Sequence, residues 1–537
     1  MISKVEEMTR KPAFIRTIPA LLAALFLVPG PAWACRSGVA DGEVTVDGRS
    51  IAWKVRQLDW QRNHLVYKHV GEPTYGPDGG LGGLVRYAYV AMIDPNPDQA
   101  VPPGNEVRQG LNTAGLTCSH NAMSQSQNWG WPNSHFLANM SAISEVHDYI
   151  ENRGITPGSF YFLNDADNYA ALWELHDSAD RSDGKGRQRF RYATTETTRD
   201  AQFITISGGV EDGRVVNRSG FAVRANTGHY SGNGNTSFGD GADTPGTTEF
   251  VTDQIARNKA ALLNLGRYGG LTVKTLFQGM IGHTGATDEY DFVREFNPST
   301  TVGATAVHGV LPGEDPRLST MWTALGHTDF SIAVPVWAVV TDLPNTMDNE
   351  DNGCFAHIVG GNSSGGGLYN SGLGATHVQA RTLPMESNFF DTVLDELLPH
   401  WRTQDWSGAA AVARITGEMT RVENQMAADA YSLLECLLNG DSNNHAPIES
   451  FISAYSATRY TVTFNGTEAD SDGTIVSRSW NYGDGQPPDA LGLHTYLEDG
   501  TYLVSFTVTD DDGVSYTDWE FVTVGRRDLS GQLHNCR

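Results

Sequence analysis

A change in residue pattern near residues 439–446 (NGDSNNHA) constrains the fold more than any other feature, because it separates two kinds of sequence. Before it, short strand-like apolar runs alternate with segments whose apolar residues recur at helical spacing, the longest from about Ser407 to Leu438. After it, strand patterns separated by turn clusters continue without helical periodicity. We therefore predict an α+β domain over residues 35–440, a polar linker over 441–446, a small all-β sandwich over 447–525 and a tail over 526–537.

The first 34 residues have the pattern of a secretory signal peptide. Basic residues precede an apolar segment, Ile18–Val28, and the residues that follow end in Ala32-Trp33-Ala34. The apolar segment is too short to span a bilayer comfortably, and no later stretch reaches the ~18 apolar residues of a membrane helix. We therefore expect an exported protein, periplasmic or extracellular, that is not integral to the membrane.

The composition excludes several functional classes. The chain has 37 basic and 63 acidic residues and a formal net charge of −26, which excludes a general nucleic-acid binder because such proteins need a basic surface. Five cysteines in 537 residues do not make a disulfide scaffold, although Cys118, Cys354, Cys436 and Cys536 could form two disulfides. The sequence contains no CxxC, HExxH or Cys/His cluster, and its acidic runs are interpreted as turns rather than calcium sites. We expect no metal and no cofactor.

Removal of the signal peptide would leave Cys35 as the first residue of the mature chain. Three interpretations compete at this position. Cys35 could carry a lipid, but lipoprotein signals usually have Leu three residues before the cysteine and a small residue two before, where this chain has Ala32 and Trp33. It could be a structural cysteine. It could also be an N-terminal nucleophile, because a free α-amine with a pKa of about 7.7–8.0 can act as the base for its own side chain.

An N-terminal cysteine nucleophile needs a cation that favours the thiolate, a carboxylate that orients the α-amine and donors for the oxyanion. Arg56, at the end of the strand pattern of residues 51–56, and Asp59, three residues later, supply the first two. Apolar and polar residues alternate along that pattern, which predicts a strand with one buried face. Taken alone, an Arg/Asp pair at this spacing is more often a surface salt bridge.

The order of these segments resembles the N-terminal nucleophile (Ntn) hydrolases of the choloylglycine hydrolase and penicillin acylase group, together with the isopenicillin N acyltransferase-like proteins. Residues 55–59 (VRQLD) resemble the GRNxD motif but lack its Gly and Asn. Residues 110–116 (GLNTAGL) resemble a G-x-N-x-x-G-L turn, and residues 217–226 end like an R-x-N segment. Residues 315–322, followed by 333–337, resemble the late Arg and proline strand of the acyltransferases.

The resemblance implies a four-layer αββα fold and a cysteine amidase or acylase that uses no cofactor. Such an enzyme cleaves or transacylates a carbon–nitrogen amide bond of a small-molecule substrate through a thioester. The resemblance assigns catalytic roles to Cys35, Arg56, Asp59, Asn226 and Arg317. For the second oxyanion donor it leaves Asn121 or a backbone N–H, while Asn112 could simply shape its turn. Neither the acyl group, the leaving amine nor the choice between hydrolase and transferase follows from the sequence.

The C-terminal strands resemble a PKD domain, an immunoglobulin-like sandwich. The resemblance rests on four segments: Trp480–Gly485 (WNYGDG), His494–Tyr496, Gly500–Tyr502 and Thr507–Asp510. It implies a spacer or a module that binds polysaccharide or a surface protein, without chemistry of its own. Two alternatives to the enzyme stay open: a non-catalytic PKD-bearing surface protein, and a lipoprotein acylated at Cys35. The oligomeric state is not predicted.

Overall fold

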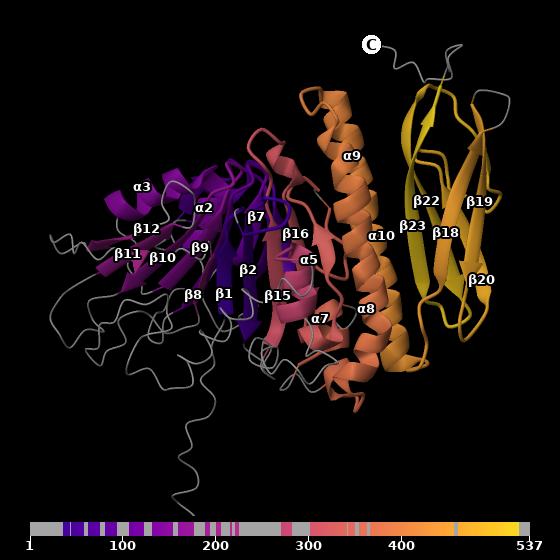
Figure 1. Ribbon diagram of the computed structural model, residues 1–537, viewed down its shortest axis with the longest axis horizontal. Coiled ribbons are helices and arrows are strands. Elements are labelled where there is room, and N and C mark those ends of the chain that lie inside the picture. The colour runs from indigo at the N-terminus through magenta and orange to yellow at the C-terminus, as the bar shows by residue number, and fades with distance from the viewer. Residues whose placement is uncertain are drawn as a thin grey trace, which may run out of the picture. The chain divides into compact units, whose positions relative to one another are not determined.

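Figure 1 shows the computed structural model of the protein. The predicted signal peptide, Met1–Ala34, lies outside the described residues. The structure describes residues 36–42, 44–57, 63–75, 81–93, 107–122, 131–153, 159–176, 188–193, 200–205, 215–216, 221–224, 270–281, 301–340, 342–348, 354–361, 366–455 and 460–525.

A six-stranded antiparallel sheet contains the segment that follows Cys35. Its strand order is β14-β1-β2-β15-β16-β17. The strands are β1 (Arg36–Ala40), β2 (Ile51–Gln57), β14 (Phe221–Arg224), β15 (Thr301–His308), β16 (Thr320–Leu325) and β17 (Val334–Val336). Strand β1 therefore lies between β2 and β14, the two strands that precede Asp59 and Asn226 in the sequence.

A nine-stranded sheet of order β13-β12-β11-β10-β9-β8-β7-β6-β3 lies against the first. Its strands are β3 (His64–Lys68), β6 (Tyr89–Ile93), β7 (Val107–Asn112), β8 (Thr117–Ala122), β9 (Ser159–Asn164), β10 (Ala170–His176), β11 (Gln188–Ala193), β12 (Asp200–Thr205) and β13 (Val215–Val216). The strands β4 (Pro73–Tyr75) and β5 (Leu81–Leu84) form a separate ribbon. Strands β1 and β2 contact β8 and β9, so the two sheets face each other.

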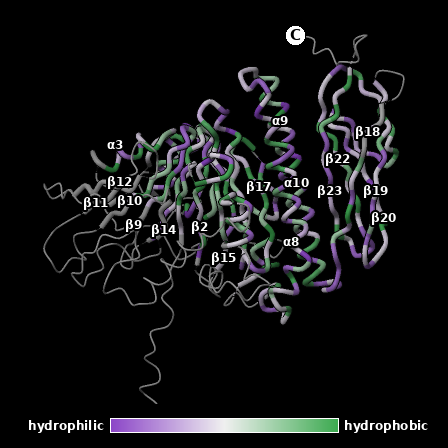
Figure 2. The backbone as a smooth tube through the Cα atoms, in the orientation of Figure 1, coloured by the Kyte–Doolittle hydropathy of each residue, from purple (hydrophilic) through white to green (hydrophobic). Residues whose placement is uncertain are grey.

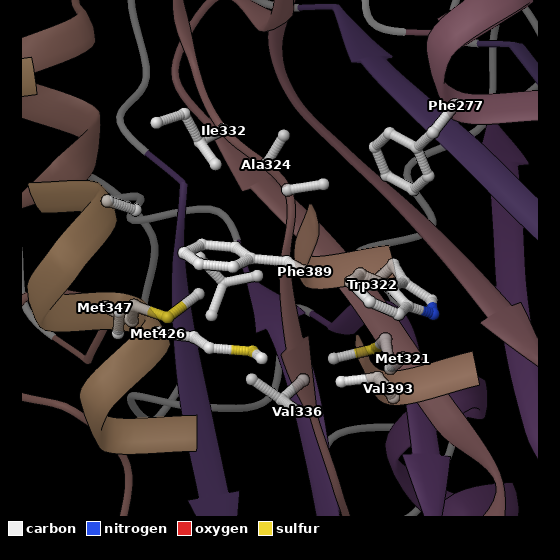
Figure 3. Packing of buried hydrophobic residues seen from close by; sticks show 14 of the residues in the cluster. Phe277, Met321, Trp322, Ala324, Ile332, Val336, Met347, Phe389, Val393 and Met426 are labelled. Atoms are coloured by element: carbon white, nitrogen blue, oxygen red, sulfur yellow. The ribbon is translucent and has the colours of Figure 1, made fainter. Parts of the chain in front are cut away.

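Helices pack on both sheets. The helix α2 (Trp131–Asn139) contacts β7 and β8, and the apolar residues of α3 (Ile143–Arg153) share a buried cluster with the nine-stranded sheet. The six-stranded sheet shares its cluster with α5 (Val273–Leu276), α7 (Phe355–Val359), α8 (Ala375–Asp391), α9 (Leu398–Arg402) and α10 (Ala409–Asn439). Figure 3 shows this packing around Trp322 and Phe389. Buried residues recur every three or four positions along α10, which gives the helix one buried face. Figure 2 shows apolar and polar stretches alternating along its tube.

Strand β2 differs from its predicted form, because both of its faces are buried rather than one. Ile51, Trp53 and Val55 belong to the apolar cluster shared with the helices, whereas Lys54 and Arg56 are also buried. Successive side chains of a strand point to opposite faces. The polar residues therefore face the second sheet instead of water, which the alternating pattern alone does not reveal.

The C-terminal region is an all-β sandwich, as predicted. Its two three-stranded sheets have the orders β18-β19-β21 and β20-β22-β23. The strands are β18 (Ile448–Tyr455), β19 (Thr461–Ala469), β20 (Ile475–Asn481), β21 (Leu493–Thr495), β22 (Gly500–Asp510) and β23 (Ser515–Val524). Trp480 and Phe506 stack in its core with ring centroids 4.1 Å apart. The mixed α/β region and the sandwich agree with the coarse fold class expected from the sequence.

The connection between α10 and the sandwich is anchored by side chains. Asn444, in the predicted linker, is buried and donates from Nδ2 to Asp510 Oδ2 at 3.1 Å. Arg421 of α10 donates from Nη2 to the Leu503 carbonyl at 2.8 Å, and its guanidinium carbon lies 5.9 Å from the ring centroid of Trp519. Helix α10 and strand β23 are in direct contact, and the linker is anchored through the buried side chain of Asn444.

Candidate active site

The β1–β2 ladder places the residue after Cys35 beside Arg56. Arg36 is the register partner of Val55, and Ser37 is the partner of Lys54. Arg56, the next residue along β2, is buried. Cys35 and Asp59 lie outside the described residues, which reach Arg36 and Gln57 on these two strands. Counted along the chain, the described strands stop one residue from Cys35 and two residues from Asp59.

Strand β14 approaches β1 from the other side. Arg224 is the register partner of Ser37, two residues after Cys35, and Arg224 itself is two residues before Asn226. Asn226 lies outside the described residues. The ladder nevertheless shows that the segments leading to Cys35 and to Asn226 run along neighbouring strands toward the same end of the sheet.

Asn121, near the end of β8 in the second sheet, contacts the first residues of β1. Its Oδ1 accepts a hydrogen bond from Ser37 Oγ at 2.8 Å and another from Lys54 Nζ at 2.7 Å. Lys54 Nζ also donates to the His120 carbonyl at 2.6 Å. All three side chains are buried. Six residues are expected in the site. Of these, the structure brings Arg56 of the first sheet and Asn121 of the second sheet close to the first residues of β1.

Lys54 and Ser37 are not among the site residues predicted from the sequence. A signal for Lys54 existed, because it alternates with Arg56 on the polar side of a strand whose other side is strongly apolar. Lys54 and Arg56 therefore share the buried face of β2 that lies against the second sheet.

Other buried polar residues between the two sheets are also hydrogen-bonded. Thr305 Oγ1 donates to Gln109 Oε1 at 2.6 Å, and Gln109 Nε2 donates to the Ala52 carbonyl at 3.0 Å. Asn164 Nδ2 donates to Ser50 Oγ at 3.2 Å, just before the first residue of β2. This polar layer joins two sheets from distant parts of the chain and holds β2 against the second sheet.

Arg317 is not brought to this place. Along the β2–β15 ladder Arg56 is the partner of Gly303, whereas Ile51 is the partner of His308. Arg317 follows His308 in the connection to β16, so it lies beyond the opposite end of the strands. There it donates to both carboxylate oxygens of Asp315, at 2.7 and 2.6 Å, and its guanidinium lies over the ring of Trp406. These contacts explain Arg317 as a residue that holds its own loop.

Asn112 shapes the turn of the GLNTAGL segment. Its Oδ1 accepts hydrogen bonds from the backbone N–H groups of Ala114 and Leu116, both at 3.0 Å. Its Nδ2 donates to the carbonyls of Leu137 and Met140 at the end of α2, at 2.9 and 2.8 Å. Of the two roles considered for Asn112, this geometry supports the one in the scaffold.

Cys118 is chemically different from a reactive cysteine. Burial raises the pKa of its thiol well above the ordinary value, and its Sγ lies 2.9 Å from Asn133 Oδ1. A thiol with a raised pKa is a poor nucleophile. Cys118, Cys354 and Cys436 are all free, buried thiols, so the two disulfides that the sequence allowed do not form. The fourth cysteine of that set, Cys536, lies outside the described residues.

Within the described part of the chain, no group of three or more His, Cys, Asp or Glu side chains is arranged to hold a metal ion. Nor do the described helices include one that is long and apolar enough to cross a membrane.

A family model for the PKD domain matches residues 444–524. Residues 444–524 are a PKD domain. The match covers all six strands of the C-terminal sandwich and confirms the resemblance found in its turn motifs.

Curated relatives match over part of the chain. The pre-pro-metalloprotease PrtV of Vibrio cholerae serotype O1 (strain M66-2) is 37% identical over 84 residues, which are 16% of this chain and 9% of PrtV. Collagenase ColQ1 of Bacillus cereus (strain Q1) is 27% identical over 154 residues, or 28% of this chain and 16% of the collagenase. The chain thus matches less than a fifth of the length of either relative.

The solved structures that are similar to more than half of the chain include a penicillin V acylase and a conjugated bile acid hydrolase. Penicillin V acylase from Agrobacterium tumefaciens is similar over 57% of this chain and 87% of its own, with 13% identity and a TM-score of 0.32. Conjugated bile acid hydrolase from Clostridium perfringens is similar over 59% of this chain and 95% of its own, with 11% identity and a TM-score of 0.32.

Proposed function

We propose that this protein is an exported Ntn cysteine amidase that cleaves or transacylates a carbon–nitrogen amide bond of a small substrate, on a four-layer αββα fold. The observation that carries the proposal is the arrangement at the start of β1. Ser37 Oγ donates to Asn121 and Ser37 is the register partner of Lys54, while Arg56 lies two residues further along β2. An N-terminal Cys35 would thus directly precede β1, the strand paired with the one that carries Lys54 and Arg56. It would also lie two residues before Ser37, which bonds the side-chain amide of Asn121.

In the proposed mechanism the α-amine of Cys35 takes the thiol proton, directly or through a water. The thiolate forms a C–S bond with the amide carbonyl carbon, and the carbonyl electron pair moves onto oxygen. Asn121 Nδ2 and Asn226 donate to this oxyanion. When the oxyanion collapses, the C–N bond breaks and the amine leaves with the proton from the α-ammonium. Water then hydrolyses the thioester, or a second amine accepts the acyl group.

Two further residues have supporting roles in this proposal. Arg56 provides positive charge that favours the Cys35 thiolate, because a neighbouring cation lowers the pKa of a thiol. Asp59 accepts a hydrogen bond from the α-amine and orients it. We leave Arg317 out of the mechanism because its loop lies at the other end of the sheet.

The PKD domain has a separate role in the proposal. We infer that it is a spacer or a binding module for polysaccharide or a surface protein. The proposed location is periplasmic or extracellular, which agrees with the signal-like first 34 residues and with a net charge of −26 on the chain.

The test replaces Cys35 with Ala and compares it with Cys118→Ala, which removes a buried thiol from the same domain. Hydrolysis of N-acyl p-nitroanilides with short, medium and long acyl chains is followed by absorbance. Cys35→Ala should abolish turnover without moving the thermal unfolding transition, whereas Cys118→Ala should retain turnover. Asp59→Asn should lower it. Full activity in Cys35→Ala would contradict the mechanism. Full activity in Asp59→Asn would assign Asp59 to a surface salt bridge instead of the site.

A further inference from the structure

Resting on the proposed function, we infer that Lys54 is a positioning residue that sets the orientation of the Asn121 amide and thereby directs its Nδ2 to the oxyanion. Lys54 belongs to none of the motifs in the sequence. It connects β2 to β8, two strands of different sheets.

The contact is short and buried. Lys54 Nζ lies 2.7 Å from Asn121 Oδ1 and 2.6 Å from the His120 carbonyl oxygen, and no part of the Lys54 side chain is exposed to solvent. Ser37 Oγ adds a second donor to Asn121 Oδ1 at 2.8 Å. Both lone pairs of that oxygen are therefore occupied.

The two donors do not constrain the amide equally. A hydroxyl both donates and accepts, so Ser37 could pair with either end of the Asn121 amide. An ammonium has three donors and no acceptor, so Lys54 can pair only with the oxygen. If the amide turned over, its N–H groups would face the ammonium in a buried site, which is strongly unfavourable. Lys54 is therefore the residue that keeps Nδ2 on the far side of the amide.

The position of this contact connects it to the site. Ser37 is two residues from Cys35, so the oxygen end of the Asn121 amide is fixed to the strand that carries the proposed nucleophile. The ammonium also polarises the amide by withdrawing charge through Oδ1, which strengthens donation from Nδ2. A purely structural role, in which Lys54 only joins β2 to β8, would affect stability and leave the oxyanion step unchanged.

The experiment uses the mature full-length protein and two reactions at the same thiol. Acylation by p-nitrophenyl acetate passes through an oxyanion and releases p-nitrophenolate in a burst. Alkylation by iodoacetamide displaces iodide at carbon and forms no oxyanion. The ratio of the two rate constants therefore reports oxyanion stabilisation separately from the reactivity of the thiolate.

Lys54→Met should slow acylation by about 10²-fold, the usual cost of one lost oxyanion donor, and leave the alkylation rate of Cys35 unchanged. In a double-mutant cycle with Asn121→Ala, Lys54→Met should have no further effect on acylation, because it acts through Asn121. Ser37→Ala should cost less, since Lys54 still holds the oxygen. Its matched control is Ser50→Ala, the same change in the polar layer near the first residue of β2, which should leave acylation unaltered.

Additive effects in the cycle, or equal slowing of acylation and alkylation, would overturn the inference and leave the proposed function intact. A wild-type Cys35 that is neither acylated nor alkylated would instead refute the proposed function. Thermal unfolding of each variant separates both results from misfolding, and the rate constants are normalised to the folded fraction.

Discussion

The replacement of Asn112 by Ala is the sharpest test of the distinction between scaffold and site. Asn112 is buried, and its amide makes four hydrogen bonds to backbone groups: two accepted from Ala114 and Leu116 and two donated to Leu137 and Met140. A hydrogen bond contributes about 1 kcal/mol to stability, and a buried group left unpaired costs about 1–3 kcal/mol. We therefore expect Asn112→Ala to lower the free energy of unfolding by about 4 kcal/mol.

Urea unfolding followed by tryptophan fluorescence measures this loss. The matched control is Asn139→Ala, because Asn139 at the end of the same helix α2 is only partly buried and bonds the carbonyl of His135 one turn earlier. The control should lose less than about 1 kcal/mol. The acylation rate per folded molecule of Asn112→Ala should equal that of the wild type. A stability loss as small as that of the control would refute the hydrogen-bond reasoning, and a specific loss of acylation would place Asn112 in the site.

Two further predictions concern the core. Burial raises the pKa of Asp429 from 3.8 to about 7, so the folded protein binds more protons than the unfolded chain between about pH 4 and pH 7, and stability falls as the pH rises through that window. Asp429→Asn should flatten this dependence, as measured by Tm across the window, and an unchanged slope would contradict the assignment. Trp322 stacks on Phe390 with ring centroids 3.8 Å apart, so Trp322→Ala should cost about 3–5 kcal/mol in urea unfolding; a cost below 1 kcal/mol would refute its place in the core.

Local patterns in the sequence predicted much of this fold. The WNYGDG turn and the strand-only pattern after residue 446 identified the PKD domain, because turn chemistry and strand alternation are local properties. The R-x-x-D spacing and the distance of Asn121 from its GL turn selected Arg56 and Asn121, which lie in different sheets near the first residues of β1.

The rest depends on contacts between distant segments. Lys54 meets Asn121 only because two sheets face each other, and a strand that looks half-exposed in sequence is buried on both sides for the same reason. Arg317 had the right residue type in a motif-like segment, yet strand register decides at which end of the sheet it lies. Neither sheet stacking nor register can be read from the spacing of residues along one chain.

The measurement that tests the central claim most directly is the intact mass of the mature protein, together with its N-terminal sequence, before and after treatment with iodoacetamide under native conditions. Tandem mass spectrometry locates the label, and the buried thiol of Cys118, whose pKa is raised, is the internal control. We predict a chain that begins at Cys35 and carries one carbamidomethyl group there, with Cys118 unlabelled. A chain that begins elsewhere, a diacylglycerol mass on Cys35, or an unlabelled Cys35 would contradict the account.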